Sequence, residues 1–148
     1  MRRLAVLALT AALLFSGILS ACGGETPPVR VVIALAEDGQ AGEVLFEQAL
    51  PPDYSGLTVA AVLDRLHADF PEVTCNYQTM ADGSRQFVGI GGITNKSAQV
   101  SAYVMQFDQW VFDIDGQAVT DMYDDAVYAG QTLHVTYRSW ESDEQPII

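Results

Sequence analysis

The sequence predicts an α+β domain with a β-grasp-like fold, in which one helix packs on a mostly antiparallel sheet. Residues 109–115 and 132–138 alternate between apolar and polar side chains, as half-buried strands do. Residues 58–70 instead repeat their apolar side chains at helical spacing. A strand pair before the helix and more strands after it favour one helix laid across one sheet.

The first 21 residues have the pattern of a secretory signal. Arg2 and Arg3 precede an apolar run over residues 4–19, and small residues lead from it to Cys22. The run is shorter than the roughly 20 residues of a spanning helix. Its ending, Leu-Ser-Ala-Cys, resembles the bacterial lipoprotein box, which implies cleavage before Cys22 and attachment of fatty acyl chains such as palmitate to that cysteine. An ordinary secretory signal or a retained anchor is the alternative.

The mature chain is expected to be acidic and to contain no disulfide. Cleavage leaves 127 of the 148 residues, with five of the seven basic residues and all nineteen acidic ones, a net charge of −14. This charge repels phosphate, so we expect no nucleic acid partner. Residues 22–28 are interpreted as a tether to the membrane. With Cys22 acylated, Cys75 is the one cysteine left, so no intrachain disulfide is expected.

Two strands are predicted ahead of the helix. Residues 29–36 (VRVVIALA) are β-branched and apolar, which favours a strand covered on both faces or nearly so. Residues 37–42 are expected to turn the chain. Residues 43–50 (EVLFEQAL) then return as a second strand, which Pro51 and Pro52 end.

The helix has the clearest pattern in the chain. Thr58 is a candidate N-cap, because its hydroxyl can accept a hydrogen bond from a free amide of the first turn. Pro71 is expected to stop the helix. Asp64 and His67 lie off the apolar stripe, which consists of Val59, Val62, Leu63, Leu66 and Phe70.

The segments after the helix are predicted less uniformly. Strands are expected at residues 72–79, 85–93 and 99–107, with a loop at 95–98. Gly89, Gly91 and Gly92 predict a bulge or a close approach of another backbone.

The last part of the chain is expected to complete the sheet. Asp115 and Gly116 suit a tight turn in which both residues have positive φ. Residues 119–129 are interpreted as an irregular connection. Residues 141–148 are interpreted as a frayed acidic tail.

Four segments together resemble the transcobalamin C-terminal-like domain, a family common in bacterial surface lipoproteins. They are TVAAVL at 58–63, FVGIGGI at 87–93, WVFDIDG at 110–116 and GQTLHVTY at 130–137. The family usually has Asn-Gly where this chain has Asp115-Gly116, and Gly-Asp where it has Gly130-Gln131. We assign residues 29–140 to this domain.

The resemblance implies a corrinoid as a ligand. In transcobalamin and intrinsic factor this domain caps a corrinoid that a large helical domain holds. The sequence has no such helical domain, so a corrinoid would be bound by this chain alone or be capped on a partner. Fold likeness by itself does not transfer an activity.

No catalytic constellation is expected. His67 and His134 are predicted on outward faces, and Cys75 lies in a predicted strand with no evident cation to stabilise a thiolate. The glycines at 89–92 lack the spacing of a dinucleotide-binding fingerprint. We predict a protein that is not an enzyme and needs no cofactor.

Five aspartates lie close together in the sequence: Asp113, Asp115, Asp121, Asp124 and Asp125. Carboxylate oxygens suit calcium, but the spacing departs from the twelve-residue calcium loop and no glutamate ends it. Turn chemistry is therefore the preferred interpretation, with a calcium site as the alternative.

The candidate ligand-binding residues are aromatic: Tyr103, Trp110, Tyr123 and Tyr128. Trp110 and Tyr137 alternate inward and are also expected in the core. Tyr123 and Tyr128 lie in the irregular connection, where side chains are free to meet a ligand. We therefore predict an extracytoplasmic binding module, anchored to the lipid bilayer through Cys22. The alternative is an adhesion or interaction module that binds another surface protein.

Overall fold

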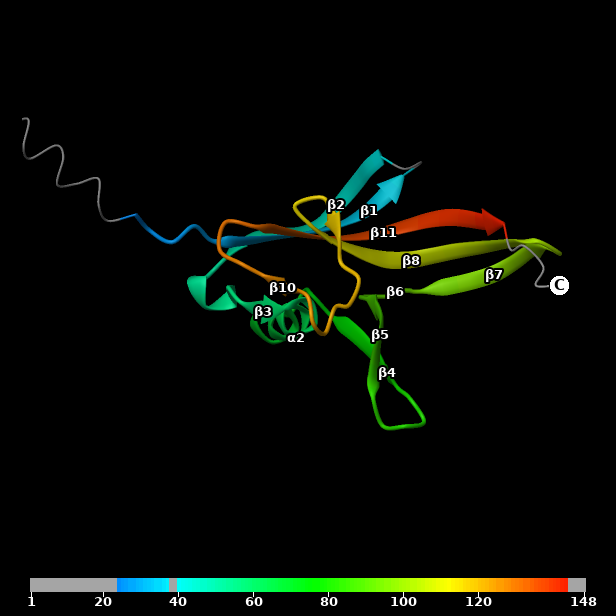
Figure 1. The fold of residues 1–148 in the computed structure, drawn as a ribbon, viewed down its shortest axis with the longest axis horizontal. Coiled ribbons are helices and arrows are strands. Elements are labelled where there is room, and N and C mark those ends of the chain that lie inside the picture. The colour runs from blue at the N-terminus through cyan, green and yellow to red at the C-terminus, as the bar shows by residue number, and fades with distance from the viewer. Residues whose placement is uncertain (1–23, 38–39, 144–148) are drawn as a thin grey trace, which may run out of the picture.

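The computed structural model describes residues 24–37 and 40–143 (Figure 1). The described part is mostly β, with one six-stranded mixed sheet and two small sheets. The predicted β-grasp-like plan of one helix on one sheet is therefore wrong. The strands are β1 (Val29–Glu37), β2 (Gln40–Leu50), β3 (Leu57–Thr58), β4 (Cys75–Thr79), β5 (Arg85–Ile90), β6 (Ile93–Thr94), β7 (Lys96–Ser101), β8 (Val104–Ile114), β9 (Gln117–Ala118), β10 (Ala126–Val127) and β11 (Thr132–Asp143).

The six-stranded sheet has the order β2-β1-β11-β8-β7, with β9 paired to β8. Only β1 and β11 run parallel in it. Strand β1 buries Val31 and Ile33 on one face. On the other face Ala34 is buried, Val32 is half-buried and Arg30 is exposed. The second face of β1 is therefore covered in part. The two alternating segments lie in one sheet, as predicted, and the structure pairs them directly, with Trp110 opposite Tyr137 in β8 and β11.

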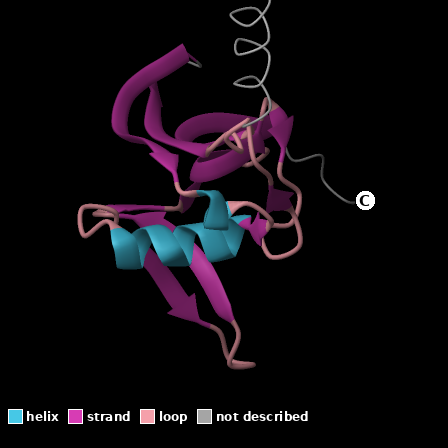
Figure 2. Ribbon diagram, turned by 90° about the vertical axis from the view of Figure 1, so that its left-hand side faces the viewer, coloured by secondary structure: helices cyan, strands magenta, loops and turns pink. Residues whose placement is uncertain are grey.

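Helix α2 spans Val59–Asp69, as predicted, and lies on one side of the main sheet (Figure 2). Thr58 is its N-cap, and its hydroxyl accepts a hydrogen bond from the Ala61 amide at 3.3 Å. Asp64 and His67 are exposed. The buried residues of the predicted stripe are Val59, Val62, Leu63 and Leu66.

Strands β4, β5 and β6 form a sheet of their own, and the β4–β5 hairpin projects from the body (Figure 1). The chain turns at Gly91, whose amide donates to the Thr74 carbonyl at 2.7 Å, so the predicted strand 85–93 is divided. Gly89 lies against the backbone of Ile93 and Thr94 and leaves no room for a Cβ atom. The predicted close approach of backbones is confirmed. It also explains the wrong fold class, because these strands pair with one another instead of extending the main sheet.

Several further boundaries differ from prediction. Strand β4 begins at Cys75 instead of residue 72, the predicted strand 99–107 is divided between β7 and β8, and β2 begins at Gln40 within the predicted turn 37–42. Residues 96–98, expected in a loop, belong to β7, whose side chains are all exposed. Such an edge strand is held by its pairing with β8 and shows no apolar alternation. Residues 141–143, expected in the tail, extend β11. Asp115 and Gly116 have φ values of 52° and 82°, which confirms the predicted turn.

The core is formed by the inner faces of β1, β8 and β11 together with α2. Trp110 is buried there, and its indole nitrogen donates to the Ile93 carbonyl at 2.9 Å. This bond ties the small sheet to the main one. The predicted signal, Cys22, Gly23 of the tether and residues 144–148 lie outside the described residues. No helix within the described ranges is long and apolar enough to cross a membrane.

Candidate functional site

The larger of two notable hollows lies between helix α2, the β4–β5 hairpin and the connection after β9. We call it the hairpin hollow. Its volume is about 700 Å³. Small-molecule pockets are typically concave, largely apolar and of this order of size. The residues that matter for its chemistry are Ala60 and Asp64 on the helix, Tyr77, Met80 and Arg85 on the hairpin, and Tyr123 on the connection.

The hairpin that forms one wall is closed by a specific turn. The Met80 amide donates to the Ser84 carbonyl at 2.8 Å, and Gly83 has a φ of +84°, a conformation that glycine adopts without strain. Asp82 accepts hydrogen bonds from the Ser84 amide at 2.9 Å and its hydroxyl at 2.6 Å. These bonds lower the pKa of Asp82, led by the hydroxyl bond. The wall is therefore ordered by local hydrogen bonds.

Arg85, Tyr77 and Asp64 form the polar part of the hairpin hollow. The Arg85 guanidinium lies 4.1 Å from the centre of the Tyr77 ring, in a cation–π contact. Its Nη2 atom lies 3.6 Å from Oδ1 of Asp64. The side chains of this ion pair are 58% and 51% exposed, so the pair contributes little to stability.

The Tyr77 hydroxyl is buried and has no hydrogen-bond partner among the described residues. Burial, followed by the neighbouring Asp64 carboxylate, raises the pKa of Tyr77. The hydroxyl therefore stays protonated, beside a carboxylate with which it makes no well-formed hydrogen bond. Buried polar groups usually have a hydrogen-bond partner, so the Tyr77 hydroxyl oxygen is an exception.

Tyr123 lines the hollow from the connection after β9. Its hydroxyl donates to the Arg85 carbonyl at 2.7 Å, and its ring is 49% exposed. The connection that carries it is fixed at the start of α2, where the amides of Val59 and Ala60 donate to carbonyls of Asp125 and Met122 at 2.9 and 2.8 Å. Helix N-termini leave such amides free, and here the connection uses them.

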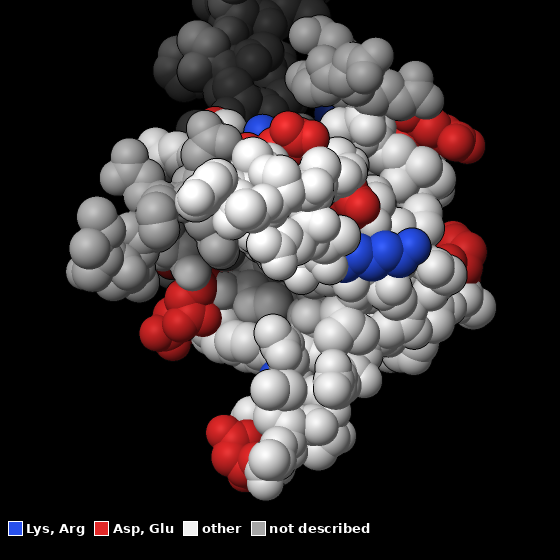
Figure 3. All heavy atoms as spheres, turned by 90° about the vertical axis from the view of Figure 1, so that its right-hand side faces the viewer, with Lys and Arg blue, Asp and Glu red and all other residues white. Residues whose placement is uncertain are grey.

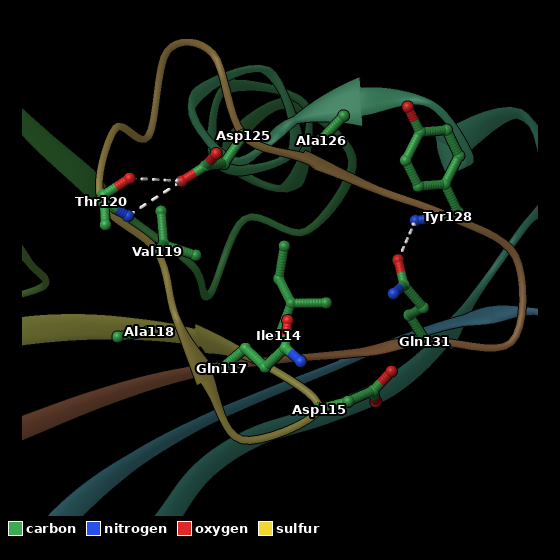
Figure 4. Close-up of a pocket in the computed structure, with 10 residues that line it drawn as sticks. All are labelled: Ile114, Asp115, Gln117, Ala118, Val119, Thr120, Asp125, Ala126, Tyr128 and Gln131. Atoms are coloured by element: carbon green, nitrogen blue, oxygen red, sulfur yellow. Dashed lines mark hydrogen bonds between the residues drawn. The ribbon is translucent and has the colours of Figure 1, made fainter.

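The second hollow, of about 350 Å³, lies beside the β8–β9 turn (Figure 4). We call it the turn hollow. Its polar atoms are largely used in structural bonds: Asp125 accepts from the Thr120 amide at 2.8 Å, and Gln131 Oε1 accepts from the Tyr128 amide at 2.8 Å. Figure 4 shows the Tyr128 ring projecting on the side away from Gln131. The turn hollow therefore offers fewer free groups to a ligand.

The aspartates serve the turns. Asp113 accepts from the Gly116 amide at 2.8 Å, Asp115 from the Thr132 amide at 2.9 Å, and Asp121 from the Tyr123 amide at 2.8 Å. Backbone bonds from Asp121 and Thr120 lower the pKa of Asp125. The predicted turn chemistry is confirmed for these four residues. Across residues 24–37 and 40–143, no group of three or more His, Cys, Asp or Glu side chains could hold a metal ion.

The four predicted ligand-binding aromatics do not form one site. Tyr103 is exposed at the β7–β8 turn, and Trp110 is buried in the core. Tyr123 lines the hairpin hollow, whereas Tyr128 lines the turn hollow. Sequence reasoning missed Tyr77, Met80, Arg85 and Asp64, which come from three separate elements and carry no shared motif.

Cys75, His67 and His134 have structural contacts. The Cys75 thiol is buried and donates to the Leu63 carbonyl at 3.5 Å. Burial, followed by Asp64, raises its pKa to about 11, so the nucleophilic thiolate is disfavoured at neutral pH. His67 Nδ1 lies 3.1 Å from the Val73 carbonyl oxygen, and His134 Nδ1 lies 3.0 Å from Asp113 Oδ1.

Comparison with known proteins gives no function for this site, so its geometry is the basis for interpreting it. No family model matches the chain, and the search of curated proteins finds no match. The resemblance to the transcobalamin C-terminal-like domain rests on its four sequence segments and stays a prediction.

Proposed function

We propose that this chain is a non-enzymatic binding module, anchored outside the cytoplasm by acylated Cys22, whose ligand occupies the hairpin hollow. The observation that supports this best is the hollow itself, which joins the exposed Tyr123 ring and Met80 thioether to the ion pair of Arg85 and Asp64. Such a surface suits an amphipathic ligand, because apolar area provides affinity and a few polar groups provide orientation.

The sequence resemblance makes a corrinoid the first ligand to test. A corrinoid is larger than a hollow of about 700 Å³, so this chain would contact one edge of it and act as a cap. Contact along an edge predicts weak binding by the chain alone and tighter binding when a partner holds the other face.

Equilibrium titration of the purified full chain with cyanocobalamin, followed by absorbance and calorimetry, tests this proposal. We expect Tyr123→Ala to weaken binding by about tenfold, since it removes an aromatic contact from the hollow. Tyr128→Ala is the matched control: it removes another exposed tyrosine, from the turn hollow, and should leave the affinity unchanged. Equal losses in both variants, or no heat with cyanocobalamin, would reject the corrinoid as the ligand.

An interaction or adhesion module is the second candidate function. Strand β7 supports it, because this strand ends the main sheet and all its side chains are exposed. An open edge can pair with an extended segment of another protein. We expect the wild-type chain to capture a surface protein. A peptide paired with β7 and held there by an engineered disulfide should block the strand edge and abolish this capture.

A further inference from the structure

Arg85 occupies the hairpin hollow as a bound cation would. Its guanidinium has an aromatic face on one side, 4.1 Å away at Tyr77, and a carboxylate oxygen 3.6 Å away at Asp64. Proteins bind organic cations with this combination of ring face and carboxylate.

The contact of Arg85 is replaceable. Its backbone is held by the Tyr123 hydroxyl, which donates to the Arg85 carbonyl, but its side chain is 58% exposed. An exposed ion pair at 3.6 Å is weak, so a competing cation has little to displace. The guanidinium can swing towards solvent without any change in the β5 backbone.

The charge of the chain also favours a cationic ligand. The chain carries a net charge of −12, and on the face in Figure 3 acidic groups lie at several points with fewer basic ones between them. A negative field raises the local concentration of cations.

We infer that the hairpin hollow binds an organic cation, a guanidinium, amidinium or ammonium group on an apolar body, and that Arg85 is an internal substitute which leaves when this ligand enters. The inference rests on the proposed function, because it names the chemical class of ligand for the same hollow. Met80 and the Tyr123 ring contact the apolar body, while Tyr77 and Asp64 bind the cation.

The test is a calorimetric titration of the full chain with benzamidine and with benzamide, its neutral analogue of similar shape. Removal of the internal competitor in Arg85→Ala should strengthen benzamidine binding about fivefold, because the competent state is then fully populated. Arg85→Gln should give the same gain of about fivefold in benzamidine affinity, because it removes the positive charge that competes with the ligand. Benzamide binding should stay unchanged in both variants.

Three controls make the result specific. Arg30→Ala removes an equal charge from an exposed ion pair with Glu47 on the main sheet, and should bind benzamidine as the wild type does. Asp64→Asn combined with Arg85→Ala should abolish the gain. Glycyl-arginyl-glycine amide and its citrulline analogue, which lacks the guanidinium charge, test whether a peptide side chain can supply the cation. The arginine peptide should bind more tightly than the citrulline peptide.

Equal affinity of wild type and both Arg85 variants for benzamidine, or equal gains for benzamide, would overturn the inference. If cyanocobalamin binds in a Tyr123-dependent manner while benzamidine does not bind at all, the proposed function stands and the cation inference falls. A gain for benzamidine without any binding of cyanocobalamin supports the cation and rejects the corrinoid.

Discussion

Tyr54 shows how single side chains join the turn before α2 to the helix itself. It is fully buried in the core, and its hydroxyl donates to Asp69 at 2.8 Å. Arg65 lies 4.4 Å from the centre of its ring and forms ion pairs with Asp53 and Asp69. Burial, followed by the Asp69 bond, raises the pKa of Tyr54 to about 12. The polar face of the helix therefore fixes the preceding turn, in addition to meeting solvent.

The buried Cys75 thiol predicts a loss of stability at high pH. Its pKa rises from an ordinary value of 9.0 to about 11, so the folded state binds a proton that the unfolded state releases. The stabilising effect is complete below pH 9 and is lost as the pH rises towards 11. The loss is on the order of 2 kcal/mol by about pH 11.

Urea unfolding of the wild type and of Cys75→Ala between about pH 8 and about pH 11 checks this effect. The difference in free energy of unfolding between the two proteins should narrow as the pH rises, since alanine has no proton to lose. A constant difference across this range would contradict the prediction.

At the scale of elements, the β8–β9 turn depends on backbone conformation more than on side-chain contacts. Gly116 has a φ of +82°, and the space that a Cβ atom would occupy there is open, so only its dihedral angle disfavours another residue. Gly116→Ala should therefore lower the free energy of unfolding by about 1 kcal/mol. Strand β8 would remain paired with β11, because that pairing extends along both strands.

Gly92→Ala is the matched control for the turn. Gly92 also has open space around it, and it lacks a positive φ. Its substitution should leave stability unchanged or raise it slightly, through a less flexible unfolded chain. Chemical denaturation of the two variants measures the contrast, and equal destabilisation by both would show that conformation at Gly116 is not the cause.

At the scale of the whole molecule, local patterns could be predicted and the division of strands among sheets could not. The apolar stripe of α2, its Thr58 cap and the Asp115-Gly116 turn depend on neighbouring residues, so the sequence reveals them. Strand β7 has no apolar alternation, and only its pairing with β8 makes it a strand.

The hairpin hollow could not be predicted for a related reason. Asp64 and Tyr123 meet the hairpin only because β4–β6 separate from the main sheet and the connection binds the start of α2. The bonds that bring them together join residues far apart in sequence, such as Tyr123 and Arg85. Tyr123 was recognisable as an exposed aromatic, but its partners in the hollow were not.

Membrane attachment of the whole molecule is predicted to depend on one atom, the sulfur of Cys22. Acyl chains contribute about 0.8 kcal/mol for each buried CH₂ group, which is enough for firm attachment when several chains are present. The mature chain, with five basic and nineteen acidic residues and a net charge of −14, has no attraction to anionic lipids, so high salt should not release the protein. The wild-type chain should therefore sediment with membranes in about 1 M NaCl.

Fractionation and intact-mass measurement of two serine variants test this attachment. Cys22→Ser should lose the mass of the acyl chains and should no longer sediment with membranes. Cys75→Ser should keep the acyl mass and sediment with membranes, because Cys75 is buried in the fold. Acylation of Cys22→Ser, or a soluble wild-type chain of unprocessed mass, would contradict the lipoprotein assignment. If the anchor holds, the predicted tether of residues 22–28 keeps the domain near the bilayer surface, where it would meet ligands outside the cytoplasm.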